Sequence, residues 1–330
     1  MPNIRAPRVL ATALLAAAAV SSMACSGMDR ARRAIADRPY EQTDSMGAPA
    51  ADVVTIPPHW PADLVENSAA VMSRAQPGIW FTLNDSGNDP LIFAVDTTGA
   101  DRGVWRIANA SNVDWESMAL GPCGAGNAGR CLYVGDTGDN DARHPNRTIY
   151  RVPEPRAGAP GARGTLRAEI LTYRYADGPH DVEAMYVAGD GATYLITKRV
   201  LKNANGAPRE ALVFALPAAD WAHSPAVAAI VDSLPIVPGS APMRLVTDAA
   251  LSPNGRLLAV RTYAQAYVFA VDSASGRVQH QVPPAVCNLI GMDEAQGEGV
   301  TWVDDRRLLF TSEGNTAPAH IARCPLPASR

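Results

Sequence analysis

Acidic side chains recur at the borders of short apolar runs in this 330-residue sequence, as in NVDWESMAL (112–120) and LYVGDTGDN (132–140). The acids at these borders are Asp114, Glu116, Asp136, Asp139, Asp181, Glu183, Asp248 and Glu298. Carboxylates gathered in one place repel one another unless a positive charge offsets the repulsion. A hard cation does so, and Ca²⁺ takes about six to eight oxygen ligands. If these acids converge, we expect them to bind calcium.

Polar residues of other types occupy the remaining borders. They are Asn84, Asp85, His180, Lys198, Arg199, Arg261 and Glu313. Cations beside a metal can hold an anionic group, so we assign this set to ligand binding. Alternatively, Lys198 and Arg261 pair with Glu183 and Asp248 and neutralise them. His180 precedes Asp181 directly and is either a ligand or base, or a turn residue.

The apolar runs themselves form a repeat. Short β-rich runs separated by Gly, Pro, Asp and Asn follow one another, whereas helical periodicity is scarce. Their alignment gives five units, which begin near residues 68, 114, 181, 247 and 297. Each unit has three strands, and a more polar fourth strand follows the first four units at 103–108, 169–176, 226–234 and 276–282. Four-stranded units in radial array define an all-β propeller. We predict five four-stranded blades, with six as the alternative if two units have been fused.

The last unit lacks a fourth strand of its own. The run VVTIPP (53–58) precedes the first unit, so we expect this N-terminal strand to complete the last blade and close the ring. In a propeller, each inner strand begins and each second strand ends on the same face. The border residues should therefore surround one central mouth. A second role stays open for the acids, because at strand entry they can bond backbone amides of the neighbouring blade and lock the ring.

The N-terminus has the features of a targeting segment. Arg5 and Arg8 precede an apolar run from Leu10 to Val20, which is too short to span a bilayer. Small residues before Cys25 resemble a lipobox, so we expect residues 1–24 to be a signal peptide and Cys25 to be a lipid anchor. Ordinary cleavage and release is the alternative. We expect a flexible tether over 25–51 and the propeller domain over 52–330.

Export places the other four cysteines in an oxidising compartment, where we expect disulfides. Cys123 and Cys131 bracket the turn of a predicted hairpin, and Cys287 and Cys324 would join the approach to the last blade to its third strand. The formal charge of −4, without a basic stripe, gives no footprint for nucleic acid. The sequence also lacks the G-x-S-x-G, H-E-x-x-H and Walker motifs.

Several motifs occur in an order that resembles a group of exported bacterial propeller proteins. They are NDSG (84–87), DWE (114–116), GDTGDN (135–140) and a late EG (298–299), and the resemblance covers about residues 60–327. The group is similar in architecture to phytase-like, esterase-like and lactonase propellers. That similarity implies a metal-bound central site.

These observations predict an exported cell-envelope propeller with an acidic, calcium-binding mouth that acts as a binding or scaffold protein. The expected partner is a small anionic ligand or an envelope protein, with membrane contact only through Cys25. The alternative is a metal-dependent hydrolase of phosphoesters or lactones, in which Lys198 and Arg261 bind the anion. We expect a monomer, because a closed ring needs no second subunit.

Overall fold

The computed structural model describes residues 46–124, 129–198, 210–236 and 242–328. The predicted signal peptide, Cys25 and Arg199 lie outside these ranges. Within them the chain is built from strands and two short 3-10 helices, η1 (Ala218–Ala222) and η2 (Pro242–Arg244). No helix of the described part is long and apolar enough to cross a membrane.

The strands form five four-stranded antiparallel blades, which confirms the predicted propeller. Blade 1 contains β3 (Ala69–Met72), β4 (Ile79–Leu83), β5 (Leu91–Asp96) and β6 (Asp101–Ile107). Blade 2 contains β7 (Trp115–Pro122), β8 (Arg130–Asp136), β9 (Arg147–Pro153) and β11 (Glu169–Tyr175). Blade 3 contains β12 (Val182–Val187), β13 (Thr193–Thr197), β14 (Ala211–Leu216) and β15 (Ala226–Leu234). Blade 4 contains β16 (Val246–Leu251), β17 (Leu257–Thr262), β18 (Gln265–Ala270) and β19 (Ala285–Asn288). Blade 5 contains β20 (Gly297–Trp302), β21 (Arg307–Ser312), β22 (Ala319–Arg323) and β2 (Ala51–Ile56).

The N-terminal strand closes the ring as predicted, because β2 pairs antiparallel with β22 in the last blade. Three parallel pairings extend the blades at their outer edges. Strand β10 (Arg163–Leu166) lies beside β6, and β11 lies beside β15. Strand β1 (Ala48–Pro49), inside the segment expected to be a tether, lies beside β19.

One expected strand is wrong. The run 276–282 makes only an isolated bridge, Val271 to Val278, and the fourth strand of blade 4 is β19 instead. The reason is burial. The run 276–282 is largely polar, whereas Cys287 of β19 is fully buried and packs with Leu289 in the core between blades 4 and 5. Apolar burial therefore selects the later segment.

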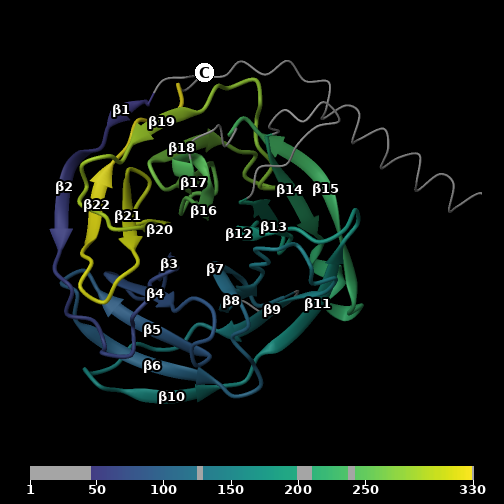
Figure 1. Ribbon diagram of the computed structural model, residues 1–330, viewed down its shortest axis with the longest axis horizontal. Helices are drawn as coiled ribbons and strands as arrows, with labels where there is room; N and C mark the ends of the chain where they lie inside the picture. Colours follow the sequence, from purple (N-terminus) through teal and green to yellow (C-terminus); the bar gives the residue numbers. More distant parts are fainter. Residues whose placement is uncertain (1–45, 125–128, 199–209, 237–241, 329–330) are drawn as a thin grey trace, which may run out of the picture. The chain divides into compact units, whose positions relative to one another are not determined.

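The five inner strands β3, β7, β12, β16 and β20 lie around the centre of the ring (Figure 1), and each contacts the next. The core lies between neighbouring blades, as where Leu83 of blade 1 packs with Leu132 of blade 2. Gly299 of β20 permits the last contact of the ring. A Cβ at this position would lie 2.9 Å from the backbone of Ala69 and Ala70 in β3, closer than a side chain tolerates.

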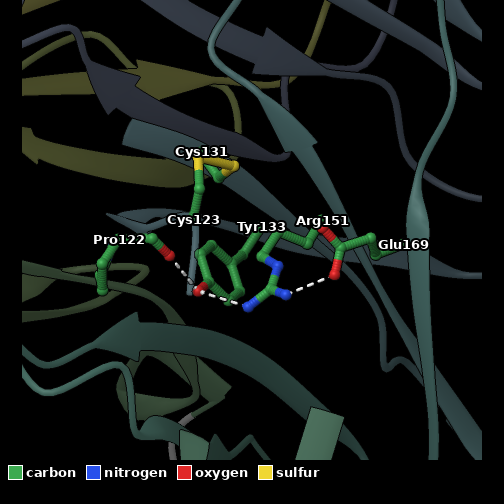
Figure 2. The surroundings of a disulfide bond; sticks show 6 residues. All are labelled: Pro122, Cys123, Cys131, Tyr133, Arg151 and Glu169. Atoms are coloured by element: carbon green, nitrogen blue, oxygen red, sulfur yellow. Dashed lines mark hydrogen bonds and ion pairs between the residues drawn. A yellow bond between two sulfur atoms is a disulfide. The ribbon is translucent and has the colours of Figure 1, made fainter. Parts of the chain in front are cut away.

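Both predicted disulfides are confirmed, Cys123 with Cys131 and Cys287 with Cys324. Figure 2 shows the first, which lies at the turn end of the β7–β8 hairpin. There the Tyr133 hydroxyl donates to the Pro122 carbonyl over 2.6 Å, and Arg151 lies between Tyr133 and Glu169. This cross-link and hydrogen bond fix the end of the hairpin.

Candidate functional site

Three carboxylates come together where blades 1 and 2 meet at the mouth. Asp85 follows β4, whereas Asp114 and Glu116 lie at the start of β7. One oxygen of each lies within 4.8 Å of the others. Two oxygens that bind the same Ca²⁺ at about 2.3–2.6 Å can be at most about 5 Å apart, so this spacing fits a shared cation.

Asn112 joins the loops that carry these acids. Its side-chain amide donates to the Asn84 carbonyl over 3.1 Å and to the Asp85 carbonyl over 2.7 Å. Its Oδ1 accepts from the Trp115 amide over 3.1 Å. The NDSG loop of blade 1 is therefore tied to the first residues of blade 2. Sequence reasoning did not single out Asn112, although it lies two residues before Asp114.

The GDTG loop of blade 2 lies against the same acids. The amides of Thr137 and Gly138 donate to the Asp114 carbonyl over 3.1 and 3.2 Å. A Cβ on Gly138 would lie 2.6 Å from Asp114 Oδ2 and 2.7 Å from Glu116 Cγ. Only glycine leaves room at this position for both side chains.

The electrostatics of these acids are unfavourable without a counter-charge. Glu116 is 7% exposed, and burial raises its pKa well above the usual value, with Glu183 and Asp85 adding to the rise. Burial, followed by repulsion from Asp85, raises the pKa of Asp114 to about 6. Neither carboxylate accepts a hydrogen bond from the described part of the chain. Asp114 and Glu116 are therefore partly shielded from water, and their carboxylate oxygens, without hydrogen bonds from the described residues, lie close to Asp85.

Lys198, which follows β13 in blade 3, places a positive charge at the mouth. Lys198 Nζ pairs with Glu183 at 2.5 Å and lies 5.6 Å from the ring centre of Tyr263. Burial alone would lower the pKa of Lys198, but Glu183 and Glu298 together raise it above its usual value. Burial raises the pKa of Glu298 to about 7, although Lys198 opposes the rise. The ammonium therefore stays charged between two buried acids.

Tyr263 is a mouth residue that the sequence reasoning missed. It is the first residue after β17, the place that Lys198 occupies after β13. The alignment assigned that border to Arg261, two residues too early. Knowledge of where β17 ends would have identified the tyrosine.

Arg261 lies in the interior rather than at the mouth. It is fully buried, and its guanidinium donates to the carbonyls of Gly299 and Thr311 and to Glu294, over 2.5–3.0 Å. The expectation that it pairs with Asp248 is also not met, because its ion pair is with Glu294. Its two Nη atoms are engaged by these groups, and its Nε is buried without a partner among the described residues, so the side chain is not exposed to an anion at the mouth.

Asp248 accepts hydrogen bonds from backbone amides of other blades and so locks the ring. Its carboxylate accepts from the amides of Ala249 and Val300, both over 2.8 Å, and from Ala70 over 3.4 Å. These amides belong to the inner strands β16, β20 and β3. Burial raises the pKa of Asp248, while these backbone hydrogen bonds oppose the rise. This acid links three blades instead of joining the carboxylates at the mouth.

Three further acids bind the loops beneath the site. Asp136 pairs with Arg147 at 3.2 Å and accepts from the Asp114 amide over 2.9 Å. Asp181 accepts from the Asp139 amide over 3.0 Å. The Asp139 carboxylate accepts from the backbone amides of Arg143 and His144. Each helps to shape the ring, and the structure groups none of them with Asp85, Asp114 and Glu116.

Of the remaining predicted residues, two hold loops in place and one lies at the acidic mouth. Asn84 accepts from two amides of the 65–66 segment, and His180 bonds Asp177 over 2.9 Å among aromatic rings. Both support loops. Glu313 is half-buried, and burial followed by repulsion from Asp85 raises its pKa, so it belongs to the acidic mouth.

The fold and these residues define a five-bladed β-propeller with an acidic central mouth. No model of a protein family matches the chain, and no curated protein matches it. A PQQ-bound aldose sugar dehydrogenase from Streptomyces coelicolor is similar at 10% identity, covering 83% of this chain and 99% of its own, with a TM-score of 0.43. A gluconolactonase from Xanthomonas campestris is similar at 15% identity, covering 88% and 99%, with a TM-score of 0.42. Such distant likenesses assign no chemistry to the mouth, which rests on its own residues.

Proposed function

We propose that this protein is an exported propeller whose mouth binds one calcium ion through Asp85, Asp114 and Glu116, and that the loaded mouth binds a small anionic ligand. The observation that carries the proposal is the close approach of three carboxylates, within 4.8 Å. Burial and repulsion disfavour the charged forms of Asp114 and Glu116, and a bound cation reverses that balance.

The donor set favours calcium over transition metals. All three groups are carboxylates, the ligands of hard cations, and sulfur and imidazole are absent from the trio. Three protein ligands also leave coordination positions for water or for an oxygen of a ligand. Lys198 supplies a second positive charge across the mouth, so an anionic group would meet the cation on one side and the ammonium on the other.

Binding is the primary function, because no nucleophile with an adjacent base is assembled among the described mouth residues. One observation favours the second candidate, a hydrolase of phosphoesters or lactones. Burial brings the pKa of Glu298 to about 7, so this acid can take up or release a proton at neutral pH beside Lys198. A hydrolase should turn over a model phosphoester or lactone with calcium present and lose that turnover in Glu298→Gln. Absence of turnover across such a panel leaves only the binding function.

The calcium site is tested by calorimetric titration of the chelated protein. We expect one site per chain, and at least tenfold weaker binding in Asp85→Asn. Asp89→Asn is the matched control, because it removes the same charge from the same loop, where Asp89 is exposed and paired with Arg106. Equal affinity in Asp85→Asn and Asp89→Asn would reject the site.

Export is supported by the two disulfides, which persist in oxidising compartments. Anchoring through Cys25 is a separate part of the proposal. Metabolic labelling of the full chain with a radioactive fatty acid should mark the wild type and not Cys25→Ser. Unlabelled wild-type protein recovered in the soluble fraction would indicate ordinary cleavage and release instead.

A further inference from the structure

A cavity of about 250 Å³ lies at the opposite end of the ring, where the five inner strands finish. Its walls come from the last residues of β3, β7, β12 and β16, from Thr301 of β20, and from the turn that follows β16. This arginine cavity, named for Arg74 and Arg130 in its wall, shares no lining residue with the acidic mouth.

Arg74 and Arg130 bring like charges together at this cavity. Arg74 is half-buried, and one of its Nη atoms donates to the Trp302 carbonyl over 2.8 Å. Burial, followed by the neighbouring charge of Arg130, lowers the pKa of Arg74 to about 10. Within the described ranges, neither guanidinium has a carboxylate partner within 4.0 Å.

The nearby acids make other contacts. Asp305 accepts from the Asn254 amide over 3.2 Å, and Glu154 Oε1 accepts hydrogen bonds from Ser73 and Gln76, while its buried Oε2 has no hydrogen-bond partner among the described residues. Both acids, with Asp304, moderate the field at Arg74 without pairing with it. The two guanidinium groups thus keep donors that no carboxylate of the described residues uses.

The first disulfide holds one side of the cavity in place. Arg130 directly precedes Cys131, and Pro122 directly precedes Cys123, so both wall residues adjoin the cross-link. Figure 2 shows Pro122 beside it. The hydrogen bond from Tyr133 to the Pro122 carbonyl adds a second constraint. The backbone that carries Arg130 is therefore positioned before any ligand arrives, which lowers the entropic cost of binding.

We propose that the arginine cavity binds a small oxyanion, a carboxylate or phosphate group on a compact body, between Arg74 and Arg130. A planar guanidinium matches either group with two parallel hydrogen bonds. An anion also offsets the repulsion between the two arginines. The cavity is smaller than the roughly 300–1,000 Å³ of pockets for drug-sized ligands, so the body that carries the charge must be small. This site is independent of the calcium proposed for the mouth.

The test uses the full chain in chelator, so that the mouth plays no part. Inorganic phosphate and malate are titrated separately at constant ionic strength, and binding is followed by calorimetry and by thermal unfolding. We expect saturable binding by at least one of the two anions. Arg74→Gln and Arg130→Gln should each weaken it at least tenfold. Phosphate alone identifies a phosphate ligand, and malate alone identifies a carboxylate.

Arg306→Gln is the matched control. Arg306 is exposed in the turn between β20 and β21, near the same face, and it does not line the cavity. Phosphate stabilises proteins in general through exclusion from their surface, and that effect should be equal in all variants. An equal, unsaturable rise in melting temperature in the wild type, Arg130→Gln and Arg306→Gln would overturn the proposal. Because Arg130 is exposed, we expect Arg130→Gln to fold normally, which keeps the comparison decisive.

Discussion

Replacing Gly138 with alanine perturbs the mouth without changing any charge. The added Cβ would lie 2.6 Å from Asp114 Oδ2 and 2.7 Å from Glu116 Cγ, whereas ordinary contact begins near 3.4 Å. Asp114 Oδ2 must therefore move away by 0.8 Å (3.4 − 2.6) and Glu116 Cγ by 0.7 Å (3.4 − 2.7). Metal–ligand distances tolerate only about 0.2 Å, so the displacement separates at least one ligand from the ion.

The expected result is calcium affinity weakened at least tenfold, or about 1.4 kcal/mol. The overpacking should also lower the free energy of unfolding by about 1–3 kcal/mol. Calorimetric titration measures the first effect and urea unfolding in chelator the second. Gly189→Ala is the matched control, because a Cβ there meets nothing within 4 Å. Wild-type calcium affinity in Gly138→Ala would refute the assignment of Asp114 and Glu116 as ligands.

Three further predictions address the supporting groups. Asp248→Ala leaves three buried amides without an acceptor, at about 1–3 kcal/mol each, so urea unfolding should show a loss of at least about 3 kcal/mol. Lys198→Gln leaves the buried Glu183 carboxyl group without its ion-pair partner, which costs about 3–5 kcal/mol, and adding Glu183→Gln should recover most of that stability. The raised pKa of Asp114 means that the folded state holds this proton more tightly than the unfolded chain. Its contribution to the stability of the metal-free protein is therefore present below pH 3.8 and lost as pH rises through about 6, while calcium affinity rises over the same interval.

Each of these predictions has a contrary outcome. An unfolding free energy in Asp248→Ala within about 0.5 kcal/mol of wild type would mean that the three amides find other acceptors. A double variant no more stable than Lys198→Gln would show that the charge of Glu183 is not what destabilises the single variant. Calcium affinity independent of pH between 4 and 6 would show that Asp114 does not lose a proton on binding.

The fold followed from the sequence because two signals repeat together. Apolar runs set the strands, and acids at or near the start of the inner strand mark the last four units, as with Asp114 before β7 and Asp181 before β12. The failure at 276–282 arose where the next strand had to be chosen between two candidates. There the burial of Cys287 decided, and local pattern does not report burial between blades.

The candidate site was less predictable. The place of an acid at the end of an apolar run tells which loop carries it, but not which groups its carboxylate oxygens contact. Asp248 and Glu298 occupy similar borders, yet one bonds three backbone amides and the other adjoins Lys198. That difference depends on contacts between blades distant in sequence. Arg261 lies inside β17, whereas Tyr263 comes just after the strand ends at Thr262. An error of two residues therefore exchanged a buried structural cation for a mouth residue.

The most direct test of the calcium-binding mouth is an anomalous difference map from crystals grown with calcium. We expect a single strong peak at the junction of blades 1 and 2, within about 2.3–2.6 Å of one oxygen each from Asp85, Asp114 and Glu116. Crystals saturated with calcium that show no peak among these three side chains would contradict it.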